Sequence, residues 1–336
     1  MDQQRTQPLE PISDPTAGHQ VETTLPSPQI VDEEIRLAPT VDERLRSGQR
    51  ELRRVLRREP TVLFSVIILA VMIFFAVFGP MVARTEYTRV DARNRLQAPS
   101  ADHWFGTDRV GRDVFDRTIV GARLSLMVGF AVTAITTVVG TTVALVVGYS
   151  RTMDNIVMRF VDGLLAFPTI LLALALIALL GASVQNVVIA LSITGTAAKI
   201  RLVRGAVLTL RESMYVEAAR SVGASLPRIL FIHIAPNTVN LVIVQATFTL
   251  AATILAEASL SFLGAGIPEH IPSWGNIVAN GQGLERRAFW VSLFPGIFLT
   301  ITVLAVVLIG DALRDYLDPK LRGRLTGGER PMEREQ

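Results

Sequence analysis

Residues 163–198 read GLLAFPTILLALALIALLGASVQNVVIALSITGTAA, and this stretch contains no charged side chain. The hydrocarbon core of a bilayer is about 30 Å thick, so a helix crosses it in about 20 residues. The stretch is therefore too long for one crossing and is interpreted as two. Residues 181–186, GASVQN, supply the turn-forming residues that would separate the two spans.

Four other stretches are apolar over a similar length. They are residues 61–82, 124–149, 234–256 and 288–310, the third of which continues past Glu257 to Leu263. Runs this long and this poor in charge are typical of bilayer spans rather than of helices buried in a soluble protein. The sequence therefore predicts an all-α, polytopic membrane protein with six transmembrane helices.

The basic residues are distributed unequally between the connections. Arginine and lysine favour the cytoplasmic ends of membrane spans. Most of them lie in residues 41–59, 149–160, 199–236 and 311–336. We therefore expect these segments in the cytoplasm, together with the N- and C-termini, and the uncharged turn at 181–186 outside.

The N-terminal part divides by composition. Residues 1–40 are rich in proline, glutamine, threonine and acidic side chains, which predicts a disordered cytoplasmic tail without a cleavable signal peptide. Residues 41–59 combine an apolar face with seven arginines. This pattern predicts a basic amphipathic helix on an anionic membrane surface, with a solvated connector as the alternative. The first transmembrane helix is then expected over residues 60–83.

One segment opposes the predicted orientation. Residues 84–118 are expected outside, yet they contain seven arginines. Within residues 108–117, aspartates and arginines recur four residues apart. In a helix this spacing places opposite charges side by side. The pattern predicts an external loop with a helix lying at the membrane surface.

The residues that the chain lacks argue against several functions. It has no cysteine, its four histidines are scattered, and neither lysine stands in a Gly-Lys-Ser/Thr sequence. We therefore expect no metal site, no phosphate-binding loop and no cofactor. No basic patch interleaved with aromatic residues suggests nucleic-acid binding. A stand-alone channel or secondary transporter would need charged residues inside several spans, and an intramembrane enzyme would need a set of catalytic side chains within the membrane. The predicted spans offer neither, which argues against both classes.

Residues 214–223 read MYVEAARSVG and predict a short amphipathic helix. One arc of its helical wheel carries the apolar side chains of Met214, Tyr215, Ala218, Ala219 and Val222. The opposite arc carries the polar side chains of Glu217, Arg220 and Ser221. Gly223 is placed to end the helix. Such a helix suits docking to a partner protein, and packing against its own bundle is the alternative.

The spacing around this helix resembles the cytoplasmic loop of the permease subunits of binding-protein-dependent ABC importers. That loop has Glu-Ala-Ala, three residues, Gly, nine residues and then Ile-x-Leu-Pro. The positions that match are Glu217, Ala218, Ala219, Gly223 and Pro236. His233 and Ala235 replace the usual isoleucine and leucine. The subfamily that carries peptides and nickel often has histidine there.

Other segments resemble the second permease of the same dipeptide, oligopeptide and nickel subfamily, in the same order along the chain. They are residues 103–108 (HWFGTD), 111–113 (GRD), 257–264 (EASLSFLG), 272–275 (PSWG) and 294–296 (FPG). The resemblance covers roughly residues 50–325. A single motif of this kind is weak, whereas the ordered set is specific.

The resemblance implies a type I ABC importer bundle with a core permease domain at 119–310, including a cytoplasmic coupling loop at 199–236. This chain would form half of a pathway for di- or oligopeptides, or alternatively for nickel or another small solute. A second permease would complete a heterodimer, two ATPase subunits would bind the ATP, and an extracytoplasmic binding protein would deliver substrate. The chain itself would be non-catalytic and multi-pass, surrounded by lipid in a bacterial inner membrane.

Coupling to the ATPases is then expected at Tyr215, Glu217, Ala218, Ala219, Gly223 and Pro236. Glu257, near the end of a span, is a candidate for lining or gating the pathway, with an interfacial or helix-bonded carboxylate as the alternative. Pro168 and Pro295 lie inside spans and suggest kinks that could serve gating. Trp274 and Trp290 are expected to anchor the chain at the outer interface.

Overall fold

The computed structural model describes residues 60–83 and 88–317, all of which belong to one compact unit of the chain. The predictions for the N-terminal tail, for the basic helix before the first span and for the tail beyond residue 317 lie outside these residues. Among the described residues, nearly all regular structure is helical. Its one β feature is an isolated bridge between Thr107 and Asp113.

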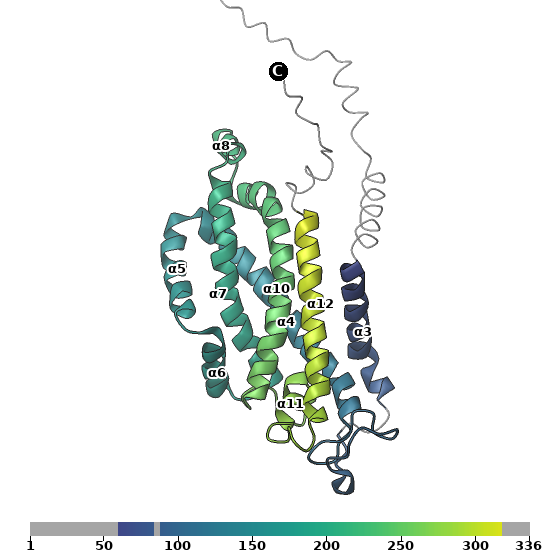
Figure 1. Ribbon diagram of the computed structural model, residues 1–336. Helices are drawn as coiled ribbons and strands as arrows, with labels where there is room; N and C mark the ends of the chain where they lie inside the picture. The colour runs from purple at the N-terminus through teal and green to yellow at the C-terminus, as the bar shows by residue number, and fades with distance from the viewer. Residues whose placement is uncertain (1–59, 84–87, 318–336) are drawn as a thin grey trace, which may run out of the picture. The chain divides into compact units, whose positions relative to one another are not determined.

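Six segments of the described chain are long and apolar enough to cross a membrane when a bent helix pair is counted as one span. The five continuous ones are α3 (Pro60–Val82), α4 (Val114–Tyr149), α7 (Val184–Arg211), the helix Leu226–Phe262 and α12 (Trp290–Leu317). The sixth consists of α5 (Arg151–Leu165) and α6 (Thr169–Leu180), bent by 91° at their junction. The prediction of an all-α protein with six spans is confirmed (Figure 1).

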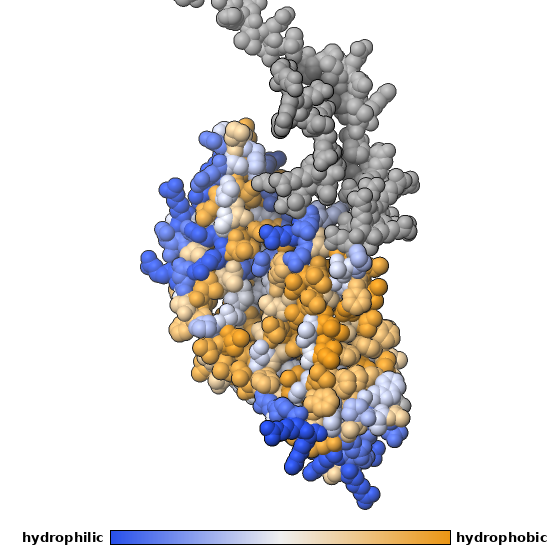
Figure 2. Space-filling view, in the orientation of Figure 1, coloured by the Kyte–Doolittle hydropathy of each residue, from blue (hydrophilic) through white to orange (hydrophobic). Residues whose placement is uncertain are grey.

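Apolar side chains cover the middle of the molecule on the face drawn in Figure 2, and hydrophilic side chains gather at both ends. Large apolar side chains such as Phe64 and Phe74 of α3 and Leu179 of α6 are exposed. A soluble protein rarely leaves so extensive an apolar surface open to water, whereas lipid covers it without cost. The surface therefore agrees with the predicted spans.

α4 and α7 pack closely along much of their lengths. Small residues make this approach possible, because a Cβ on Gly140 would lie 2.7 Å from Lys199 Cγ and one on Gly148 would lie 2.7 Å from Val207 Cγ1. Lys199, which we expected in a cytoplasmic loop, is therefore buried between two spans, with 3% of its surface exposed.

The predicted loop at 199–236 is mostly helical, and its bounds as a cytoplasmic segment stay a prediction. α7 continues to Arg211 and the next span begins at Leu226. The connection between them contains only α8 (Met214–Ser221) and a few flanking residues. Hydropathy placed the boundaries at the first charged residue, but a helix continues beyond its apolar stretch where its polar side chains find partners.

The α5 helix supplies such partners. Asp162 and Asp154 of α5 form ion pairs with Arg201 and Arg204 of α7. The chain then leaves α5 at a short break that ends at Pro168, and α6 starts after it. Proline has no N–H and disfavours helical conformation in the residue before it. The kink suggested at Pro168 is therefore a complete break between two helices.

Residues 108–113 form a turn, so the predicted surface helix over 108–117 is wrong in its first half. Gly111 has φ +84°, a conformation that ends regular helix. The carboxylate of Asp108 accepts hydrogen bonds from two backbone N–H groups of the turn, both at 2.9 Å. The expected ion pair between Asp108 and Arg112 forms at 2.6 Å, but across this turn.

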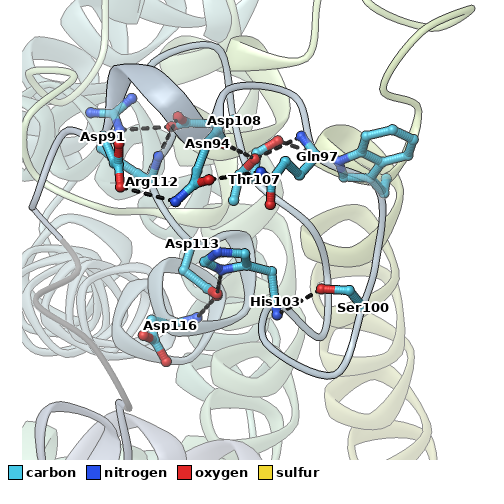
Figure 3. Close-up of polar contacts among 11 residues, drawn as sticks. Asp91, Asn94, Gln97, Ser100, His103, Thr107, Asp108, Arg112, Asp113 and Asp116 are labelled. Carbon is cyan, nitrogen blue, oxygen red and sulfur yellow. Dashed lines mark hydrogen bonds and ion pairs between the residues drawn. The ribbon is translucent and has the colours of Figure 1, made fainter.

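Asp113 sets the start of α4 at Val114. Its carboxylate accepts a hydrogen bond from the N–H of Asp116 at 3.1 Å and lies 2.7 Å from Nδ1 of His103, as Figure 3 shows. This arrangement is a helix N-cap. An aspartate spaced for a charge ladder is equally able to cap a helix, and here the cap and the glycine turn determine the structure.

Gly111→Ala is expected to lower the thermal unfolding temperature of the purified protein. A Cβ at this position would lie 1.8 Å from the carbonyl oxygen of Asp91, and the positive φ adds strain. The expected cost is roughly 1–3 kcal/mol. Gly283→Ala is the matched control, because Gly283 has φ +74° but open space around its Cβ. Equal shifts in the two variants would show that the contact with Asp91 is unimportant.

Candidate functional site

α8 projects from one end of the helix bundle, between α7 and the span that begins at Leu226 (Figure 1). Its C-terminal end is closed by two backbone hydrogen bonds, from Gly223 N–H to Arg220 O at 2.9 Å and from Ala224 N–H to Ala219 O at 3.0 Å. With φ +78° at Gly223, this is the Schellman arrangement. The predicted helix and its glycine end are both present.

The inner face of α8 packs on its own bundle. Val216 is fully buried in a cluster with Ile229, Leu230 and Ile234 at the start of the following span. Ala219 is also buried, so it does not share the open arc that the helical wheel gave it. The inward role of Val216 was not predicted, although Val216 lies three residues before Ala219, the spacing of one helix face.

The outer face of α8 is apolar and open. Met214 and Val222 are 87% and 84% exposed, and Tyr215 and Ala218 are also exposed. Beside them lies a hollow of about 640 Å³. Its lining includes Tyr215, Ala218, Ala219, Val222, Gly223 and His233. Hydrophilic side chains gather at this end of the molecule in Figure 2, together with some apolar ones, and the open apolar face of α8 is a candidate protein-binding surface.

The polar face of α8 contacts the end of α4. Arg220 Nε donates a hydrogen bond to the Tyr149 hydroxyl at 3.1 Å, and the guanidinium lies 4.9 Å from the centre of that ring. Glu217 is exposed and lines a second hollow of about 540 Å³, together with Tyr149 and Arg151. Through Arg220 and Val216, α8 is attached to α4 and to the following span.

The span after α8 begins irregularly. α9 (Leu226–Arg228), the π-helical η2 (Ile229–Ile234) and α10 (Ala235–Phe262) join into one helix. Pro236 has no N–H to donate within a regular α-helix. At the end of η2 the backbone N–H of Ala235 donates a hydrogen bond to the carbonyl oxygen of Leu230, five residues earlier. The π-helix was not predicted, although Pro236 was the available signal.

Glu257 of α10 is fully buried near the opposite end of the bundle. Its Oε1 accepts a hydrogen bond from Ser261 Oγ at 2.9 Å, and its Oε2 accepts one from Ser125 Oγ of α4 at 3.2 Å. Ser125 Oγ in turn accepts a hydrogen bond from the backbone N–H of Trp274 at 3.2 Å. The carboxylate therefore links α4, α10 and α11 (Trp274–Asn280), and a gating role stays a prediction.

Trp274 and Trp290 do not anchor the chain in lipid, and that prediction is wrong. Both are buried, and their indole N–H groups donate to the carbonyl oxygens of Thr118 at 3.0 Å and Thr107 at 3.3 Å. Tryptophan becomes buried where its N–H finds such an acceptor. Pro295 lies within α12, which continues through it without a break.

The family described as "Binding-protein-dependent transport system inner membrane component" matches residues 136–323, which include α8, Gly223 and Pro236. The chain belongs to this family. Residues 49–99 also match the N-terminal transmembrane domain of oligopeptide transport permease C. The protein is thus a permease subunit of an ABC importer and a multi-pass protein of a bacterial inner membrane.

Several curated relatives resemble this permease over most of their length. A probable peptide ABC transporter permease of Sinorhizobium fredii is 48% identical, over 81% of this chain and 93% of the relative. A dipeptide transport system permease of Alkalihalophilus pseudofirmus is 43% identical, over 82% and 91%. A glutathione transport system permease of Escherichia coli is 41% identical, over 84% and 93%.

Proposed function

We propose that this permease forms half of the pathway of an ATP-driven peptide importer and receives its driving force through α8. The observation that carries the proposal is the apolar face of α8, open at a polar end of the molecule while its inner face is fixed to the bundle. A partner ATPase covers this face. In this orientation the α8 end lies in the cytoplasm and the α11 end lies outside.

The attachments of α8 explain how motion reaches the spans. When two partner ATPases bind ATP and close, they displace α8. Val216 transfers the displacement to the span Leu226–Phe262, and Arg220 transfers it to Tyr149 at the end of α4. The connections on either side of α8 are only a few residues long, so they absorb little of the motion. ATP and its hydrolysis belong to the partners, and this chain contributes no catalytic group.

Peptides are the substrate class that the relatives support. Their names refer to peptide, dipeptide, oligopeptide and glutathione transport. A second, non-identical permease completes the pathway, and a binding protein outside the membrane supplies the peptide. The core of this half is residues 119–310, with coupling at Tyr215, Glu217, Ala218, Gly223 and the residues that support them, Ala219 and Pro236.

Reconstitution into liposomes tests this proposal. The purified chain alone is expected to give no peptide uptake. Uptake should require the second permease, both ATPases, the binding protein and ATP. Uptake by the chain alone, or uptake driven by an ion gradient without ATP, would instead identify a channel or a secondary transporter and would contradict the proposal.

A further inference from the structure

The end of the bundle opposite α8 includes two segments that lie against each other. One is residues 88–113 and the other is residues 281–289, between α11 and α12. The guanidinium of Arg109 donates a hydrogen bond to the carbonyl oxygen of Gln282, and the indole of Trp290 donates to Thr107. These contacts join the two segments into one surface.

Three of the four aspartates in residues 88–113 make hydrogen bonds or ion pairs within this segment, as Figure 3 shows. Asp91 caps the short helix η1 (Ala92–Asn94) and accepts a hydrogen bond from Asn94 Nδ2 at 3.0 Å. Asp108 holds the turn and pairs with Arg112, and Asp113 caps α4 and contacts His103. Asp108 and Asp113 are both buried. The carboxylates of Asp91, Asp108 and Asp113 are therefore engaged in contacts within the loop.

Most arginines of the same two segments have exposed side chains. We call the exposed set the external arginine face. It consists of Arg89, Arg93, Arg95, Arg109, Arg286 and Arg287. None of these six forms an ion pair with a carboxylate of the described residues. The exposed carboxylates at this end are fewer, namely Asp102, Glu269 and Glu285. The surface is thus positively charged.

This placement is unusual, because basic residues near membrane spans favour the cytoplasmic side. The loop engages Asp91, Asp108 and Asp113 in its own contacts and exposes six arginines, which opposes that preference. Binding of an anionic partner accounts for this arrangement. Exposed Trp104 lies on the same segment and packs edge-to-face on Phe115, 4.7 Å between ring centres. Arginine and tryptophan are the side chains most enriched at the energetic centres of protein interfaces.

We propose that the external arginine face binds an acidic surface of the substrate-binding protein that delivers peptide to this permease. The inference rests on the proposed importer function and adds the chemistry by which the partner is recognised. Opposite charges across such an interface accelerate encounter and orient the partner before close contact forms. The mixture of arginine with an exposed aromatic ring, held on hydrogen-bonded loops, favours a protein over anionic lipid headgroups.

The test measures binding of the binding protein that restores uptake in the reconstitution above. The complete importer is placed in nanodiscs of zwitterionic lipid, and Kd is measured at ~20 mM and ~300 mM salt. The double variant Arg93→Glu, Arg95→Glu is expected to raise Kd on the order of tenfold at low salt and less at high salt. Asp102→Arg is the matched variant of opposite sign and is expected to lower Kd.

Three outcomes separate the possibilities. An unchanged Kd in both variants overturns the inference, while uptake by the unaltered complex keeps the importer function intact. A change that appears only when anionic lipid is added to the nanodiscs would assign the arginines to lipid headgroups and also overturns it. If no binding protein stimulates uptake by the unaltered complex, the proposed function itself fails.

Discussion

Gly223→Asp is expected to lower peptide uptake by at least about tenfold while the permease still inserts and assembles. Gly223 has φ +78°, and no atom outside its immediate neighbours lies within 4 Å of the position of its Cβ. The variant side chain therefore has room within this chain. It adds strain and a negative charge at the C-terminal end of α8, where the helix dipole disfavours one. It also projects into the hollow that a partner must fill.

The measurement compares ATP hydrolysis with uptake in liposomes that contain the complete importer. In the variant, hydrolysis should persist without matching uptake, because a docked helix that no longer fits transmits less motion. The loss of about tenfold corresponds to about 1.4 kcal/mol, which is typical of one important interface residue. Gly181→Asp is the matched control, since Gly181 has φ +90° and open space but lies in the turn between α6 and α7. Normal uptake by the Gly223 variant, or an equal loss in both, would contradict the role of α8.

Glu257→Ala is expected to produce the largest loss of stability among single substitutions in the spans. The side chain is fully buried, and its carboxylate accepts hydrogen bonds from Ser125 and Ser261. Alanine removes both acceptors and leaves a cavity, at a cost of about 2–5 kcal/mol. In a chain of this size the unfolding temperature should fall by roughly 3–7 °C, because the entropy of unfolding grows with chain length.

Glu257→Gln is the control, because glutamine keeps the volume of the side chain and one acceptor oxygen. Thermal unfolding of the purified complex should show a small shift for glutamine and a large one for alanine. Protease cleavage between α10 and α11 should also increase in the alanine variant, since Trp274 loses its indirect link to α10 through Ser125. Equal unfolding temperatures for the unaltered protein and the alanine variant would show that this network does not hold α11.

The spans and α8 were predictable because each depends on local pattern. A long uncharged run such as residues 163–198 is compatible with few structures. The predicted glycine-containing turn at 181 lies where α6 ends and α7 has not yet begun. The same holds for α8, in which helical periodicity and Gly223 define both faces and the end. Even there, the wheel placed Ala219 on the open arc, because only the packing of Val216 decides which side faces inward.

The structure of residues 88–113 was predictable only in part. Asp108 and Asp113 have the spacing of a charge ladder, but their hydrogen bonds to backbone N–H groups hold a turn and a helix cap rather than a continuous helix. The close contact between Gly111 and Asp91, twenty residues earlier in the chain, is a tertiary feature that no local pattern contains. Burial of Trp274 likewise depends on the carbonyl of Thr118 in another helix. These contacts depend on packing between segments that are distant in the sequence.

Site-directed cross-linking tests most directly whether an ATPase covers α8. The chain contains no cysteine, so Ala218→Cys on the open face of α8 introduces a single thiol. Asp102→Cys at the opposite end serves as the control position. With a short thiol-directed photo-cross-linker in the complete importer, position 218 is expected to cross-link to an ATPase subunit, and position 102 is not. Cross-links from position 218 that reach only the two permeases would contradict the account.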